Sequence, residues 1–140
     1  MALVAVALLA LFGWAIRALL GPEPERLPLR EGEEILLTRW ANHSKRLGGS
    51  GTLSVTTQRL LFHAKKLSFR REPVAIELAS IRDVRTAHWQ THLLVVTDAG
   101  HDVFVVDGGA DLAALIGRLV AAPENQRQAV HAAWREAPSA

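Results

Sequence analysis

Eight basic side chains are concentrated in residues 39–71, a stretch that contains no acidic residue. This stretch has a formal charge of +8. Residues 1–38 (three basic, five acidic) contribute −2 and residues 72–140 (five basic, nine acidic) contribute −4, which together give the net charge of +2. A charge block of this kind indicates an anionic partner, either a lipid surface or nucleic acid. A solvated basic face is the alternative.

The residue types that bind metals or catalyse reactions show no comparable pattern. In "HWQTH", His88 and His92 have a spacing that would bring two ligands together on a helix but separates them by about 13 Å along a strand. Asp98 and Asp102 flank a predicted hairpin, where carboxylates usually cap the turn in solvent. The chain has no cysteine, Gly-rich phosphate loop, HExxH or Gly-x-Ser-x-Gly motif. We therefore expect a protein that is not an enzyme and uses neither a cofactor nor a metal ion.

The first twenty residues are predicted to cross a membrane. The segment "ALVAVALLALFGWAIRALL" contains one charged residue, Arg17, and would reach about 28 Å as a helix, close to the thickness of the hydrocarbon layer. Trp14 and Arg17 would lie near the headgroups. The alternatives are a cleaved signal peptide, although no positive region or small-x-small cleavage site is evident, and a buried core helix. Arg17, Arg26 and Arg30 lie on the C-terminal side, which the positive-inside rule places in the cytoplasm.

A globular domain, residues 31–122, is expected to follow this anchor (residues 1–20) and a proline-rich linker (residues 21–30). Seven segments alternate apolar and polar residues as strands do: 33–43, 51–57, 59–64, 74–78, 80–89, 92–97 and 101–107. Residues 110–122 change to the period of an amphipathic helix. Residues 123–140 are expected to form a helical or disordered tail. The order of elements predicts a mainly β fold, a seven-stranded antiparallel barrel capped by a C-terminal helix.

The segment "GTLSVTTQRLLF", residues 51–62, resembles the hairpin of the GRAM and bacterial pleckstrin-homology (PH) families. The resemblance covers about residues 31–120 and implies the PH fold. Gly51 would allow a close approach of the neighbouring strand, and Arg59 is expected to tie the hairpin turn to a nearby strand or carbonyl group and not to bind a ligand. The residues that match are Gly32, Glu33, Gly51, Leu53, Val55, Thr56, Arg59, Leu60, Phe62, Ile81 and Val84.

The resemblance also implies where a ligand would bind, because two basic loops of a PH-like fold open at the same end of the barrel. An anionic leaflet would attract each cation by up to about 1 kcal/mol, and a phenylalanine in the second loop would insert into the interface. A basic edge that prevents aggregation of strands is the alternative. The candidate lipid-binding residues are Lys45, Arg46, Lys65, Lys66, Phe69, Arg70 and Arg71.

Together these features predict a single-pass bacterial protein whose PH/GRAM-like domain lies on the cytoplasmic side of the cell membrane. Its expected partners are an anionic lipid surface, an unidentified protein, or both. Nucleic acid is not expected, because the chain has no tyrosine and few aromatic residues outside apparent core positions. The alternatives are a purely protein-binding adaptor or scaffold, and an exported PH-like domain released by signal cleavage.

Overall fold

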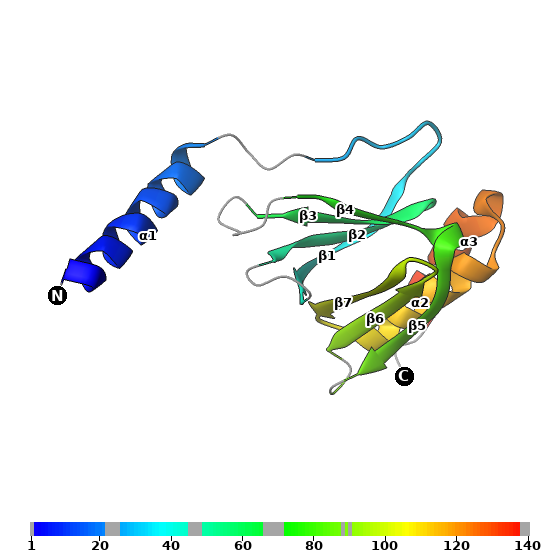
Figure 1. The fold of residues 1–140 in the computed structure, drawn as a ribbon. Helices are drawn as coiled ribbons and strands as arrows, with labels where there is room; N and C mark the ends of the chain where they lie inside the picture. Colours follow the sequence, from blue (N-terminus) through cyan, green and yellow to red (C-terminus); the bar gives the residue numbers. More distant parts are fainter. Residues whose placement is uncertain are drawn as a thin grey trace.

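The computed structural model describes residues 2–21, 26–44, 49–65, 72–87, 89 and 91–137. This part of the chain contains three α-helices, seven strands and two short 3₁₀ turns (Figure 1). Each predicted strand and the predicted amphipathic helix begin and end within two residues of the observed bounds. In chain order the elements are α1 (Ala2–Leu20), β1 (Ile35–His43), β2 (Ser50–Thr56), β3 (Arg59–Ala64), β4 (Val74–Glu77), η1 (Leu78–Ser80), β5 (Ile81–Ala87), β6 (His92–Thr97), β7 (Gly100–Val106), α2 (Gly109–Ala121), η2 (Glu124–Gln126) and α3 (Arg127–Glu136).

The N-terminal helix α1 is exposed and takes no part in the hydrophobic core. Its window from Leu3 to Leu20 is long and apolar enough for one membrane crossing, and only 6% of that window is buried. In Figure 1 the helix stands away from the strands. The buried-core-helix alternative is therefore wrong, whereas a membrane anchor and a signal sequence both fit this helix.

The seven strands form one antiparallel sheet in the order β4-β3-β2-β1-β7-β6-β5. β1 joins the two halves of this sheet. It pairs with β2 along nearly its whole length, but with β7 only through Ala41, Asn42 and His43. The sheet folds over at this short seam, so that the inner faces of the two halves meet in one core. In the described part of the chain β4 and β5 are the end strands, and the predicted barrel is open between them.

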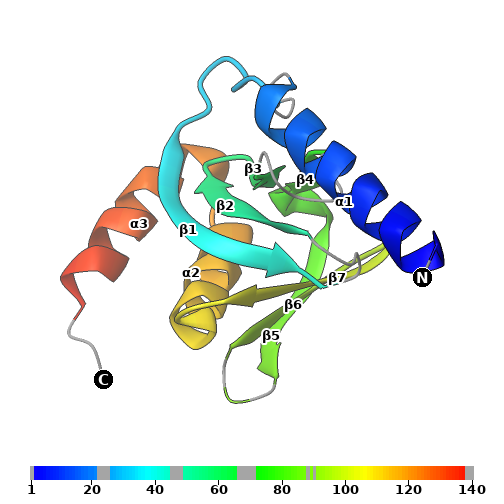
Figure 2. The same cartoon turned by 90° about the vertical axis from the view of Figure 1, so that its left-hand side faces the viewer.

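The hydrophobic core fills the space between the two halves of the sheet and one side of α2. α2 contacts β5, β6 and η1, and α3 packs against α2 (Figure 2). Full burial of one leucine or phenylalanine contributes about 1.5–3 kcal/mol, which makes this core the main stabilising feature of the fold. The predicted mainly β fold with a C-terminal capping helix is confirmed. The largest core side chains are Leu53, Leu60, Leu78, Leu93, Phe104, Leu112, Leu115, Ile116 and Leu119.

Candidate functional site

Of the predicted lipid-binding residues, the structure describes Lys65. This residue follows β3 directly, and its backbone N–H donates to the carbonyl oxygen of Ser50 at 2.8 Å. In the sequence, the other candidates follow β1 or β3 closely, so two described strand ends lead into the basic segments. The candidates outside the described residues are Lys45, Arg46, Lys66, Phe69, Arg70 and Arg71.

Lys65 stacks on the indole ring of Trp40, which lies on the outer face of β1. Its Nζ atom is 3.9 Å from the ring centroid, well inside the distance of about 6 Å at which a cation–π contact is significant. Trp40 is 64% exposed. A large amphipathic side chain therefore lies at the surface beside a positive charge, and their contact contributes about 0.5–1 kcal/mol at an exposed position of this kind.

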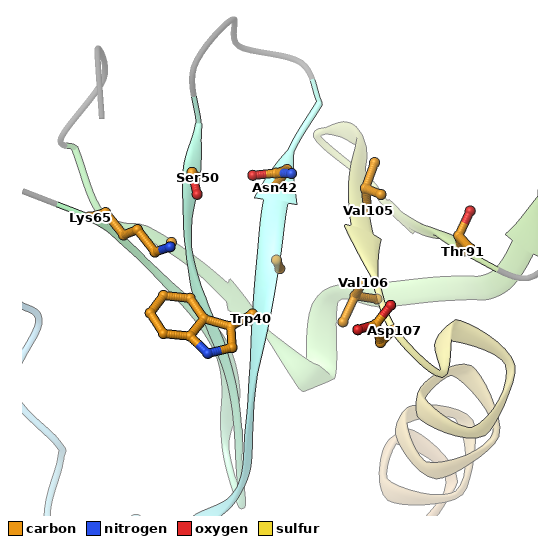
Figure 3. A pocket seen from close by; sticks show the side chains of 10 residues that line it. Trp40, Asn42, Ser50, Lys65, Thr91, Val105, Val106 and Asp107 are labelled. Carbon is orange, nitrogen blue, oxygen red and sulfur yellow. The ribbon is translucent and has the colours of Figure 1, made fainter. Parts of the chain in front are cut away.

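A hollow of about 410 Å³ opens beside this pair, across the seam between β1 and β7 (Figure 3). Asn42 and Ser50 line it with an amide and a hydroxyl group, and the carboxylate of Asp107 lies on the side opposite Lys65. The hollow therefore offers both hydrogen-bond donors and acceptors beside an indole ring, since the amide and the hydroxyl can do both and the carboxylate accepts.

His63 of β3 lies on the same outer face as Trp40. Strand pairing places Trp40 opposite Thr52, and Thr52 opposite His63. Because neighbouring strands are about 4.8 Å apart, Trp40 and His63, which lie two strands apart, are separated by about 10 Å. Burial lowers the pKa of the His63 imidazole, and the positive charges of two nearby arginines lower it further. The ring is therefore neutral at pH 7 and can accept a hydrogen bond at Nε2.

Residues 26–30, here called the strap, are bound along the outside of the domain. The Leu27 N–H donates to Nε2 of His63 at 3.1 Å. The guanidinium group of Arg30 donates to both carboxylate oxygens of Glu77 at the end of β4. The second half of the predicted linker is thus hydrogen-bonded to β3 and β4.

A buried ion pair joins the strap to the hairpin. Arg59 donates from Nε and Nη2 to the two carboxylate oxygens of Glu33, at 2.9 and 3.0 Å, and from Nη2 to the Pro28 carbonyl oxygen at 2.7 Å. The Thr56 hydroxyl and the Arg30 N–H also donate to Glu33, each at 2.7 Å. Burial alone raises the pKa of Glu33, but these hydrogen bonds outweigh it and lower the pKa to about 2. The structural role expected for Arg59 is confirmed.

The acidic residues of the β6–β7 hairpin differ from the prediction in one case. Asp98 forms an exposed ion pair with Arg82 at 2.8 Å, as a residue at a turn can. Asp102 is not a solvated cap, because its carboxylate lies 2.8 Å from Nε2 of His43, a side chain that is almost completely buried. The His43 ring also stacks on Phe104, with centroids 4.9 Å apart.

Two further observations concern metal ligands and the surface of the other half of the sheet. No group of three or more His, Asp or Glu side chains that could hold a metal ion occurs in the residues that the structure describes, and His88 lies outside them. A second hollow, of about 460 Å³, lies on the outer face of β5, β6 and β7 and is lined in part by Leu94, Val96 and Val103.

Trp40 is a surface residue that the sequence analysis did not single out. A signal for it exists in the alternation of β1. Thr38 and Asn42, which share its register, are polar and exposed, whereas Ala41 and His43 are buried. A tryptophan in the polar register of a half-buried strand is an exposed aromatic residue, and such residues are candidates for binding.

Comparisons with known proteins agree with this architecture. Residues 29–107, more than half of the chain, match the family described as "Bacterial PH domain". Among solved structures, the N-terminal PH domain of Vps36 has a TM-score of 0.54 at 18% identity, covering 67% of this chain and 83% of that one. The C-terminal domain of an unknown protein from Leishmania infantum has a TM-score of 0.49 at 18% identity, with coverage of 64% and 87%. Likeness at this identity shows the fold alone. A comparison with curated proteins gives no match.

Proposed function

Since the chain belongs to the bacterial PH domain family, we propose that it is a non-enzymatic binding module tethered to the cell membrane. In this proposal α1 is the anchor, and the basic segments after β1 and β3 contact anionic lipid. Binding of a protein partner at the same membrane is compatible with this role. The hairpin residues that resemble the GRAM family have a structural role, because Arg59 and Glu33 bind each other.

The observation that supports the proposal most strongly is the distribution of the eight cations in residues 39–71, here called the basic block. Two of its eight cations serve the domain itself: Arg59 binds Glu33, and Arg39 donates to the Asp107 carbonyl oxygen at 2.9 Å. The other six lie in the sequence at or just after the ends of β1 and β3. Each would gain about 1 kcal/mol near an anionic leaflet, so several acting together give substantial binding.

The cytoplasmic orientation rests on the charges around α1. Arg17 lies in its last turn, and Arg26 and Arg30 follow within ten residues of its end. Short segments rich in arginine and lysine beside a membrane span stay on the cytoplasmic side. The anionic lipids of that leaflet would then face the basic block.

Binding to vesicles tests the lipid contact. Residues 26–137, without α1, would be mixed with vesicles of increasing anionic lipid content, and sedimentation with the vesicles would be measured. We expect binding to increase with anionic content and to fall with salt, as the Debye length shortens from about 10 Å at 0.1 M to about 3 Å at 1 M. The variant with Lys65→Glu and Lys66→Glu should lose most of this binding.

A matched control is available on the other half of the sheet. Arg82→Glu with Arg85→Glu changes the net charge by the same amount, on exposed side chains of β5, and should reduce binding much less. Equal binding to neutral and anionic vesicles, or none to either, would remove the lipid contact and favour the purely protein-binding adaptor. The apolar hollow on β5, β6 and β7 is the observation that favours that alternative.

The anchor is tested separately. The full-length chain should stay in the membrane fraction after a carbonate wash, because an apolar helix of this length inserts stably. Recovery of a soluble chain that starts near Gly21 would show instead that α1 is a cleaved signal sequence and that the domain is exported.

A further inference from the structure

The strap limits how the domain can lie relative to its anchor. α1 ends at Leu20 and the strap begins at Arg26, so only residues 21–25 connect them. Six steps of at most about 3.6 Å give a reach of roughly 20 Å. A domain of about 110 residues is wider than this, since its radius of gyration alone is roughly 13 Å. The side of the domain that carries the strap must therefore stay close to the end of α1.

Trp40 lies on that side. The Leu27 N–H binds His63 on the outer face of β3, and Trp40 is on the same face, two strands away and about 10 Å from His63. In Figure 1 α1 lies to the left of the strands, whereas α3 lies on the right of the molecule. The predicted basic segments begin where β1 and β3 end, three residues after Trp40 and directly at Lys65.

From these positions we propose that the outer face of β1–β3 around Trp40 is the surface that the domain lays on the membrane. The indole of Trp40 enters the interfacial layer of the bilayer, and the ammonium group of Lys65 lies among anionic headgroups. This inference rests on the proposed anchoring role of α1 and adds to it a residue and an orientation. The occupant of the surface is the lipid bilayer itself.

The chemistry of the surface fits this occupant. Tryptophan favours the membrane–water boundary because its ring is apolar and its N–H is polar. Trp40 is exposed, and the cation–π contact with Lys65 holds a positive charge at its edge. Asn42 and Ser50 supply hydrogen-bonding groups in the adjoining hollow. The pairing of an exposed indole with a cation beside an anchor gives both the apolar and the electrostatic part of binding to an anionic membrane surface.

The orientation can be measured in the full-length chain, because the sequence has no cysteine. A single cysteine would replace Asn42, an exposed neighbour of Trp40 on the same face, and carry an environment-sensitive fluorophore. The matched position is Gln128, which is exposed on α3. It lies near Thr57 in the β2–β3 turn, at the end of β2 and β3 that is far from the basic segments. Each labelled protein would be reconstituted into anionic vesicles that contain lipid with a nitroxide quencher near the headgroup.

We expect the label at Asn42→Cys to be quenched several-fold more than the label at Gln128→Cys. Adding Trp40→Ala should reduce the quenching at position 42, because the face then loses its interfacial side chain. Similar quenching at both positions, or no effect of Trp40→Ala, would overturn the proposed face even while the protein remains in the vesicles. Loss of the protein from the vesicles in a carbonate wash would overturn the anchor instead, so the two failures are distinguishable.

Discussion

Arg59 and Glu33 form a buried ion pair that holds the β2–β3 hairpin, the entry to β1 and the strap together. Their side chains are joined by two hydrogen bonds, at 2.9 and 3.0 Å, and the two residues are only 5% and 6% exposed. Two further donors satisfy the carboxylate, and a carbonyl oxygen of the strap accepts from the guanidinium group. The residues that resemble a family motif thus serve the fold, and the proposed binding role rests on other side chains.

Replacing one partner of this pair should destabilise the domain strongly. Glu33→Ala leaves the guanidinium group of Arg59 buried without its counter-charge, and breaking a buried pair in this way costs about 3–5 kcal/mol. Urea denaturation of residues 26–137 would measure the loss. Arg82→Ala is the control, since it breaks an exposed pair with Asp98 and should cost less than about 1 kcal/mol. Equal losses in the two variants would contradict the central role of the buried pair.

The same pair makes stability depend on acid. The pKa of Glu33 is lowered to about 2 in the folded domain, below its usual value of about 4.3 in an unfolded chain. Its contribution is therefore present above the unfolded pKa and is lost as the pH falls toward the folded pKa, by up to about 3 kcal/mol. Denaturation at pH values from 7 to 2 would show this loss. Glu33→Gln should flatten that part of the curve, and an unchanged curve would exclude Glu33 as its source.

Two glycines should respond to alanine in opposite directions. A Cβ at Gly51 would collide with the backbone carbonyl of His63 on the paired strand, so Gly51→Ala must separate β2 from β3. We expect a loss of about 1–3 kcal/mol, as for other overpacked positions. Gly117 lies in α2 with nothing within 4 Å of an added Cβ, and Gly117→Ala should stabilise by about 0.5–1 kcal/mol. Thermal melting of both variants would test the two predictions. A stabilising effect of Gly51→Ala would disprove the close approach of β2 and β3 at Gly51.

The elements of the fold were predictable because their signals are local. The alternation in β2 and β3 and the apolar stripe of α2 each reflect one buried face, so a period of two or 3.6 residues identifies them. The capping position of α2 could be predicted from the same stripe, because the open side of the sheet is where these apolar side chains can be buried.

The contacts of the strap were not predictable in this way. "RLPLR" has no period and reads as an extended linker, and its partners His63 and Glu77 lie more than thirty residues away in the sequence. Asp102 was misread for the same reason, because only the folded hairpin brings it to His43. The alternation of β1 does place Trp40 in the polar register, but its contact with Lys65 depends on the pairing of β1, β2 and β3, which no local pattern gives.

Removing the strap should weaken the domain although the core stays complete. A chain of residues 31–137 lacks the bonds from Leu27 to His63, from Arg59 to Pro28, and from Arg30 to Glu33 and Glu77. At about 0.5–1.5 kcal/mol for each of the three hydrogen bonds outside the exposed Arg30–Glu77 pair, we expect it to be about 1.5–4.5 kcal/mol less stable than residues 26–137 in urea denaturation. Arg30→Ala in the longer chain should account for only a small part of this, because its pair with Glu77 is exposed.

The difference between the two chains should also depend on pH. The pKa of His63 is lowered by burial and then by the charges of Arg26 and Arg59, and a protonated ring cannot accept the Leu27 N–H. The contribution of that hydrogen bond is therefore present in full above pH of about 6.5, the usual pKa of histidine, and is lost as the pH falls through the lower pKa of the folded state. Equal stability of the two chains at pH 7 would show that residues 26–30 are a free linker, and the short reach from α1 to the Trp40 face would then no longer hold.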